Sequence, residues 1–244
     1  MLHTYFRKFI LALAYIHATA VSAEAVDGSL ASKHIDLNVQ TILTTAETNL
    51  RLLGSLYARD GVGALEASVP TVLPKLPAVR AVIVLDSDGT LIYVSFQSPA
   101  TKLNLSTREY FLSAKVGPGL FVGSPVRGKT SGVPFVPVSV GIWDDDTFHG
   151  AAVAVINPAK LARPEGFDHC ANCFSAVIKS SGVMLSVYPP GTEISDSYLD
   201  SLQLPNQASK GARKVPYNLH SARTNWIRNQ QHPVISIFSV VEPN

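Results

Sequence analysis

A long stretch without proline, from Leu30 to Arg59, is the feature that most limits what this chain can fold into. Its apolar residues recur at alternating intervals of four and three, which is the heptad register of a helix with one buried stripe. The stripe consists of Val39, Leu43, Ala46, Leu50, Leu53 and Tyr57. We expect a helix of roughly 45 Å at 1.5 Å per residue, with Ser29 or Ser32 as N-cap and Asp60-Gly61 at its end. Such a helix either packs on its own sheet or forms a dimerising, signal-carrying spine, and its register is compatible with both.

Strand periodicity follows a second, shorter helix that we expect over Val62–Leu76. Two apolar runs, Ala81–Leu85 and Leu91–Val94, flank Asp86-Ser87-Asp88-Gly89, whose glycine supplies the positive φ of a hairpin turn. Further strands are expected over Leu120–Val126, Val133–Trp143 and Phe148–Ile156. Because the last two links between these strands are short, neighbouring strands should be antiparallel.

A second set of strands is expected after a break at Asn157–Pro164. Phe174–Lys179 and Val183–Tyr188 indicate another hairpin, and Val234–Val241 indicates an apolar final strand. Between them we expect a short helix near Ser197–Leu204 and then polar coil. The fold class is therefore α+β, with a long N-terminal helix followed by two antiparallel sheet subdomains. The expected divisions are 24–77 for the two helices, 78–163 for the first subdomain and 164–244 for the second.

The first 23 residues have the layout of a secretory signal: a short basic head, an apolar stretch of about 15 residues and the small-residue site Val21-Ser22-Ala23. The apolar stretch is shorter than the roughly 20 residues that span a bilayer, which favours cleavage over an uncleaved membrane anchor. In either case we expect a periplasmic or otherwise extracytoplasmic location. The chain is then a complete exported protein or the outer part of a longer receptor, and the sequence does not separate the two.

Charge and composition argue against several classes of function. The chain has 46% hydrophobic and 16% charged residues, and removal of the leader leaves 18 basic and 18 acidic residues. A neutral body without a basic face is not expected to bind nucleic acid. No phosphate loop, nucleophile elbow or zinc-protease motif occurs. We therefore expect a protein that is not an enzyme and that holds no cofactor and no metal.

Arg108 leads the candidate binding residues, within the segment Ser106–Phe111 just ahead of the later strands of the first subdomain. Its guanidinium stays charged and matches the geometry of a carboxylate, while Tyr110 and Phe111 offer aromatic walls that exclude water. The alternative is that Arg108 pairs with Glu109 or another acid and that both aromatics fill the core. A cation that is removed from water needs a partner of some kind in either case.

Ser124 and Ser139 are further candidates, because both fall on expected strands and carry hydroxyl groups. Whether they line a pocket depends on the phase of the period-2 alternation, which the sequence leaves open. Cys170 and Cys173 are the only cysteines and lie at the expected junction of the subdomains. In an exported protein such a pair is most often a disulfide, while a structural free-thiol pair, a redox pair and a metal site are the alternatives.

The order of these elements resembles the double Cache family, also called PDC sensor domains, which form the extracytoplasmic ligand-binding parts of bacterial receptors. The resemblance runs from about Val26 to the C-terminus and rests on four segments in order before Leu161. They are Asp86–Thr90, Ser106–Phe111, Val122–Val126 and Phe148–Val153. It implies two PAS-like sheets, one distal and one proximal to the membrane, with a small-molecule pocket usually in the distal one.

The resemblance also bears on the ligand. In members that bind amino acids, an Arg-x-aromatic-aromatic element grips the ligand carboxylate, which here implies Arg108, Tyr110 and Phe111. Those members hold the ligand ammonium with a carboxylate at the end of the last distal strand, and the corresponding residue here is Val155. A valine cannot pair with an ammonium group, so a bound amino acid would pay the desolvation of that charge. A small organic anion, such as a simple carboxylate, fits better.

Two hypotheses follow for the function. The first is an extracytoplasmic sensor that binds a small organic anion in the distal pocket and transmits the signal through the N-terminal helix and the C-terminal strand, with a homodimer through the long helix as a further option. Such a protein is associated with the membrane if its leader is uncleaved or a C-terminal helix follows. The second is a stand-alone exported binding or interaction protein of the same fold without a signalling output.

Overall fold

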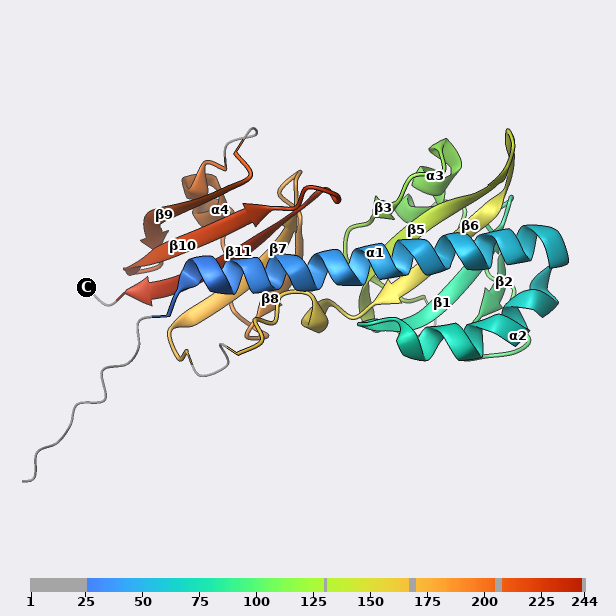
Figure 1. Cartoon of the computed structure of the whole chain (residues 1–244), viewed down its shortest axis with the longest axis horizontal. Coiled ribbons are helices and arrows are strands. Elements are labelled where there is room, and N and C mark those ends of the chain that lie inside the picture. Colours follow the sequence, from blue (N-terminus) through green and yellow to red (C-terminus); the bar gives the residue numbers. More distant parts are fainter. Residues whose placement is uncertain (1–25, 130, 167–169, 205–207, 243–244) are drawn as a thin grey trace, which may run out of the picture.

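The computed structural model describes residues 26–129, 131–166, 170–204 and 208–242. Its central element is helix α1, Gly28–Asp60, which runs along the whole molecule and packs on one side of two separate sheets (Figure 1). Most of the expected stripe is buried, and Ala31, Ile35 and Ile42 extend it. The leader, for which we expected a signal or an anchor, lies outside the described residues. Among the helices of the described residues, none is both long enough and apolar enough to span a bilayer.

Asp27 is the N-cap of α1, so the expectation of Ser29 or Ser32 in that position is wrong. The Asp27 carboxylate accepts hydrogen bonds from the backbone N–H groups of Ser29 at 2.9 Å and Leu30 at 3.2 Å. A carboxylate there satisfies two otherwise orphaned donors and complements the helix dipole. Gly61, at φ 73°, ends the helix as expected, and its N–H donates to the carbonyl of Tyr57.

The first sheet has the strand order β2-β1-β6-β5-β3, with β4 also paired to β5. All of its pairings are antiparallel, as the short links predicted. Its strands are β1 Val79–Asp86, β2 Leu91–Val94, β3 Phe121–Val122, β4 Val126–Arg127, β5 Pro134–Asp144 and β6 Thr147–Ile156. Helix α2, Val62–Val72, the 3-10 turn η1, Leu73–Lys75, and helix α3, Glu109–Val116, complete this subdomain. The single strand expected over Leu120–Val126 is instead broken into β3 and β4 by Gly123-Ser124-Pro125.

The second sheet has the order β8-β7-β11-β10-β9 and is also antiparallel. Its strands are β7 Cys173–Lys179, β8 Met184–Tyr188, β9 Lys210–Tyr217, β10 His220–Arg228 and β11 Val234–Glu242, and helix α4, Asp196–Leu202, covers it. The expected polar coil after α4 is therefore wrong, because β9 and β10 form a hairpin there. The 3-10 turn η2, Pro158–Lys160, lies in the link between the sheets, and the expected boundary at residues 163 and 164 falls in the same link.

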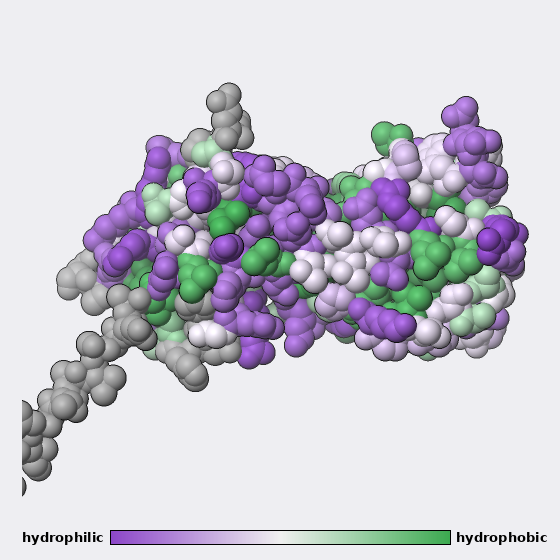
Figure 2. Space-filling view, in the orientation of Figure 1, coloured by the Kyte–Doolittle hydropathy of each residue, from purple (hydrophilic) through white to green (hydrophobic). Residues whose placement is uncertain are grey.

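One continuous core joins α1 to both sheets. Ile35 and Phe238 belong to the same buried cluster as Leu50, Val82 and Val138, so the helix shares its stripe between the second sheet and the first. The α+β fold with a long helix and two antiparallel sheets is confirmed. Because α1 starts where β11 ends, the two ends of the described chain lie together beside the second sheet, and the first sheet lies farther away (Figure 1). In the same orientation, the space-filling view shows more apolar surface over the first sheet than over the second (Figure 2).

Two polar side-chain contacts connect the second sheet to the middle of α1. The Thr44 hydroxyl lies 3.1 Å from Nε2 of His232, and the Asn229 amide donates to the Asp36 carboxylate at 2.9 Å. Burial lowers the pKa of His232, against the raising effect of the nearby Glu47 and Asp36 carboxylates. Burial raises the pKa of Asp36, while Asn229 and His232 oppose that rise.

A buried hydroxyl network stabilises the other face of the second sheet. The Tyr198 hydroxyl on α4 lies 2.7 Å from both Thr224 Oγ1 on β10 and Ser239 Oγ on β11, which are 3.0 Å from each other. Every member is fully or almost fully buried, so the network replaces the water that these groups lose on folding.

Candidate functional site

A cavity of about 270 Å³ lies on the face of the first sheet that is turned away from α1. The period-2 alternation of the strands decides which residues reach it. Val82 and Val84 of β1 point into the core under α1, while Ala81 and Ile83, which alternate with them, line the cavity. Val155 of β6, the register partner of Ala81, lines it as well.

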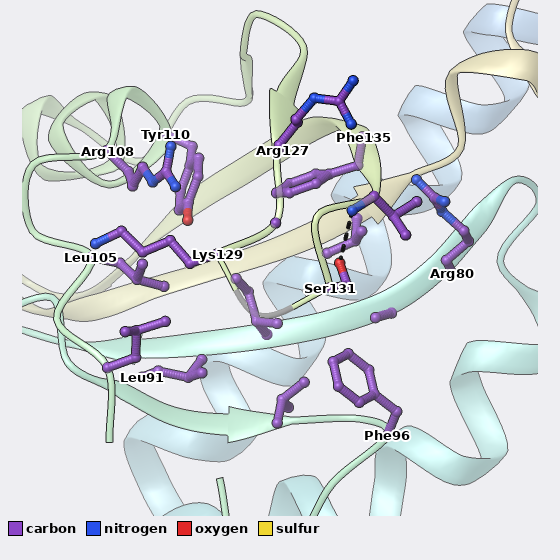
Figure 3. Close-up of a pocket in the computed structure, with 17 residues that line it drawn as sticks. Arg80, Leu91, Phe96, Leu105, Arg108, Tyr110, Arg127, Lys129, Ser131 and Phe135 are labelled. Carbon is purple, nitrogen blue, oxygen red and sulfur yellow. Dashed lines mark hydrogen bonds between the residues drawn. The ribbon is translucent and has the colours of Figure 1, made fainter. Parts of the chain in front are cut away.

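Three connections close this cavity over the sheet (Figure 3). They are the segment from Leu103 to Tyr110, the described residues of the link between β4 and β5, and the start of the link after β2, where Phe96 lies. Phe135 extends over the centre of the cavity, and Leu91 and Leu105 form one end. The floor and walls are therefore largely apolar.

The Leu103–Tyr110 segment is held in place by the hairpin turn of β1 and β2. Gly89, at φ +79°, lets the turn approach the segment so closely that a Cβ there would lie 2.6 Å from Cα of Ser106. Its carbonyl accepts the N–H of Leu105 at 2.8 Å. Asn104 stabilises the segment itself, because its side-chain oxygen accepts from both the N–H and the hydroxyl of Ser106. The expected glycine turn thus also orients the candidate binding segment.

Arg108 stands at the N-cap position of α3 with an extended backbone, and its side chain makes no capping bond. Its carbonyl instead accepts the N–H groups of Phe111 and Leu112. The side chain is half-buried and points into the cavity beside Tyr110 (Figure 3). Within the described part of the chain, its guanidinium makes no hydrogen bond and no ion pair, although Glu109 is its neighbour in sequence.

Glu109 is occupied elsewhere. Its carboxylate accepts the N–H of Ser124 at 3.1 Å and pairs with the Lys179 ammonium at 3.4 Å, so it links α3 to the end of β7 in the second sheet. Partial burial would raise the pKa of Glu109, but the bond from Ser124 and the charge of Lys179 hold it below the usual range. Lys179 also lies over the ring of Phe121, 5.1 Å from its centroid.

Tyr110 complements Arg108 as a hydrogen-bond donor. Burial raises the pKa of the Tyr110 phenol, against the lowering effect of the Arg108 charge, so the hydroxyl stays protonated at neutral pH. The guanidinium presents only hydrogen-bond donors to a bound group, and the phenol beside it adds a hydroxyl that can donate.

Three more cations surround the cavity, and the sequence reasoning missed them. Arg80 donates to the carbonyl of Pro134, Arg127 to that of Gly132 at 3.0 Å, and Lys129 to that of Asn104 at 3.2 Å. No aspartate or glutamate is among the described residues that line the cavity. The electrostatic field therefore favours an anion.

The other predicted binding residues lie outside the cavity lining. Phe111 is buried in the core of this subdomain, in edge contact with the ring of Phe148 at 5.8 Å between centroids. Ser139 lies on the cavity face of β5 but beneath α3, where its hydroxyl donates to the carbonyl of Tyr110 at 2.8 Å. Ser124 lies between β3 and β4 and uses its backbone N–H to hold Glu109. Of the predicted set, the structure brings Arg108 and Tyr110 together in the cavity.

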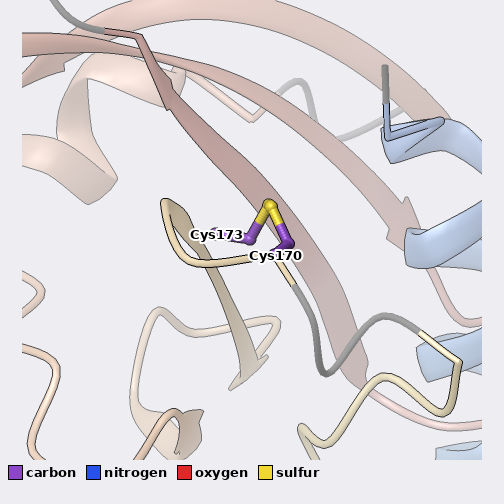
Figure 4. The surroundings of a disulfide bond; sticks show 2 residues. All are labelled: Cys170 and Cys173. Carbon is purple, nitrogen blue, oxygen red and sulfur yellow. A yellow bond between two sulfur atoms is a disulfide. The ribbon is translucent and has the colours of Figure 1, made fainter. Parts of the chain in front are cut away.

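The two cysteines form a disulfide at the entrance to β7 (Figure 4). The carbonyl of Asn172, inside this short loop, accepts the N–H of Val241 near the end of β11. No cluster of three or more potential metal ligands occurs among the described residues.

Comparison with known proteins gives no match by sequence, either to a family model or to a curated protein. Solved structures do match. The extracellular domain of rpHK1S-Z16, which carries a provisional assignment as a histidine kinase, superposes with a TM-score of 0.73 at 20% identity, covering 87% of this chain and 92% of that one. The chain has the double Cache fold.

Other structural neighbours are ligand-binding domains of chemoreceptors. The domain of Pseudomonas fluorescens CtaA in complex with L-leucine has a TM-score of 0.66 at 12% identity, with 88% of this chain and 91% of that one covered. The domain of Campylobacter jejuni Tlp3 in complex with L-valine has a TM-score of 0.61 at 13% identity, with 88% and 90% covered. These neighbours are sensor and receptor domains rather than enzymes.

Proposed function

We propose that this double Cache chain is an extracytoplasmic sensor domain that binds a small organic anion, a carboxylate, in the cavity of the first sheet. The observation that carries the proposal is Arg108, a half-buried cation with no anionic partner among the described residues. Removing a charge from water is costly unless a counter-charge is present. A ligand carboxylate supplies that charge and can accept two parallel hydrogen bonds from the guanidinium.

The surroundings of Arg108 support this choice over a cationic or zwitterionic ligand. Arg80, Arg127 and Lys129 add positive potential around the cavity, and Tyr110 adds a neutral donor. Val155 lines the cavity at the position where the resemblance places an ammonium-binding carboxylate in amino-acid sensors. The Tlp3 and CtaA domains are found with amino acids, whereas this cavity offers no described acidic side chain to an amino group.

Two contacts support transmission of the signal from this cavity toward the ends of the chain. Glu109, next to Arg108, bridges to Lys179 at the end of β7, and Lys179 is the register partner of Val234 at the start of β11. Helix α1 packs on both sheets through one core, so a change in the first sheet bears directly on the helix. Ligand binding signals if it favours one arrangement of these contacts over another.

Calorimetry and thermal unfolding with a panel of small carboxylates test the proposal. We expect at least one acid to bind with a dissociation constant in the micromolar to millimolar range and to raise the melting temperature, and Arg108→Ala to abolish both effects. Arg59→Ala is the matched control, because Arg59 is an exposed arginine that pairs with Asp60 at the far end of α1, away from the cavity. If no acid shifts the wild type, or if Arg108→Ala responds as the wild type does, the cavity is not the anion site.

A stand-alone exported binding protein of the same fold is the second candidate function, since the cavity geometry would serve it equally. The coding region beyond Asn244 separates the two. A membrane helix followed by a kinase, cyclase or chemoreceptor region supports the sensor, and a stop codon supports the stand-alone protein.

A further inference from the structure

The wall of the cavity points to the body of the ligand rather than to its charge. Aliphatic side chains from β1, β2, β6 and the segment before α3 form a continuous apolar surface. They are Ile83, Leu91, Val94, Leu103, Leu105 and Val155. Phe135 covers its centre, and Phe96 stands at the edge with 67% of its surface exposed (Figure 3). A fully polar ligand would leave this surface without an apolar partner.

The cations around the cavity are not equivalent. The guanidinium groups of Arg80 and Arg127 and the ammonium of Lys129 each donate to a backbone carbonyl, and these bonds hold the loop between β4 and β5 over the sheet. Arg108 makes no such bond. Among the described lining residues, Arg108 is thus the one cation whose guanidinium is fully available to bind a carboxylate. A dicarboxylate needs a second such group at the opposite end of the cavity.

We infer that the ligand is a small monocarboxylate with a branched aliphatic or aromatic body and no ammonium group, which includes simple and 2-oxo acids with the carbon skeletons of apolar amino acids. This inference rests on the proposed function. The carboxylate binds Arg108, the apolar body packs on the wall that includes Phe135 and Val155, and an uncharged 2-oxo oxygen can accept from the Tyr110 hydroxyl. The volume of about 270 Å³ lies near the lower end of ligand pockets, which limits the ligand to a small acid.

Calorimetry of the purified chain with a matched series of ligands tests this inference. The series is propanoate, 4-methylpentanoate, 4-methyl-2-oxopentanoate, L-leucine and succinate. Each additional buried carbon should tighten binding about fourfold, so 4-methylpentanoate, with its three further carbons, should bind roughly sixtyfold more tightly than propanoate. L-leucine should bind at least about tenfold more weakly than either six-carbon acid, because its ammonium group finds no partner.

A wall variant separates the apolar contact from the charge. Because Phe96 is largely exposed, Phe96→Ser is not expected to impair folding. It should weaken the binding of 4-methylpentanoate several-fold and leave the binding of propanoate unchanged. Circular dichroism and the melting temperature without ligand verify that the variant is folded.

The possible outcomes distinguish failure of the inferred ligand class from failure of the proposed anion site. Tighter binding of succinate or L-leucine than of 4-methylpentanoate, with loss in Arg108→Ala, overturns the inferred ligand class and leaves the anion site in place. Equal binding of propanoate and 4-methylpentanoate overturns the class in the same way. Absence of binding by every acid in the series overturns both the ligand class and the proposed carboxylate site.

Discussion

Replacement of Gly89 by alanine tests how the fold positions the binding segment. Gly89 has φ +79°, and an added Cβ would lie 2.6 Å from Cα and 2.7 Å from N of Ser106, which are backbone atoms that cannot move aside alone. The segment that carries Arg108 must therefore shift as a unit. The hydrogen bond from Leu105 to the Gly89 carbonyl, at 2.8 Å, is the first contact at risk.

The expected loss of stability in Gly89→Ala has two parts. A left-handed backbone costs an alanine about 1–2 kcal/mol, and loss of the Leu105 hydrogen bond with a shifted segment adds about 1–2 kcal/mol. Gly182→Ala is the matched control: Gly182 has φ +92° in the corresponding hairpin of the second sheet, and nothing lies within 4 Å of its added Cβ. It should show the first part alone.

Urea titration measures the free energy of unfolding of both variants, and calorimetry measures their affinity for 4-methylpentanoate. We expect Gly89→Ala to lose about 2–4 kcal/mol of stability and Gly182→Ala about 1–2 kcal/mol. Affinity should fall about tenfold or more in Gly89→Ala, equivalent to 1.4 kcal/mol, and stay unchanged in Gly182→Ala. Equal losses of stability, or normal affinity in Gly89→Ala, would refute the role of the turn in orienting Arg108.

Three further predictions concern the second sheet and its contacts. Tyr198→Phe should lower the free energy of unfolding by about 1–3 kcal/mol, because two buried hydroxyls lose a partner; Tyr217→Phe, whose hydroxyl bond to a carbonyl is exposed, should cost clearly less in the same urea titration. Burial lowers the pKa of His232, so the unfolded chain takes up its proton first, and stability should fall as pH drops below the unfolded value of about 6.5. His232→Asn should reduce that slope in urea titrations between about pH 7.5 and 5.5, and an unchanged slope would rule out His232 as its source. Lys179→Met should lower the free energy of unfolding by less than about 1 kcal/mol, because its partner carboxylate is half-exposed. The variant should keep its anion affinity but show a smaller anion-induced change in the hydrogen exchange of β11. A full β11 response would exclude the ion pair as the link.

The long helix and most of the strands could be predicted because their patterns are local. The heptad stripe fixes which side of α1 is buried whatever it packs against, and the apolar runs of β1, β6, β7 and β11 are long enough to be recognised. The hairpin of β9 and β10 escaped because β9 is an edge strand in which only Val215 is fully buried. Such a strand carries little apolar alternation and resembles coil in sequence.

The candidate site was predictable only in part, for a similar reason. Arg108 and Tyr110 lie in one short segment, so their proximity follows from the sequence. Arg80 lies near the start of β1, Arg127 ends β4 and Lys129 follows it. These cations therefore come together only after the sheet has formed. The phase of β5 placed Ser139 on the cavity face, but α3 covers it there, and no periodicity in the sequence indicates that cover.

The most direct test of the central claim is a crystal structure of the chain with 4-methyl-2-oxopentanoate, the 2-oxo acid of the proposed class. We expect the carboxylate on the Arg108 guanidinium at hydrogen-bond distance, roughly 2.7–2.9 Å, with the branched end against Phe135 and Val155. A ligand bound on the second sheet or on the surface, with Arg108 still unpartnered, would contradict it.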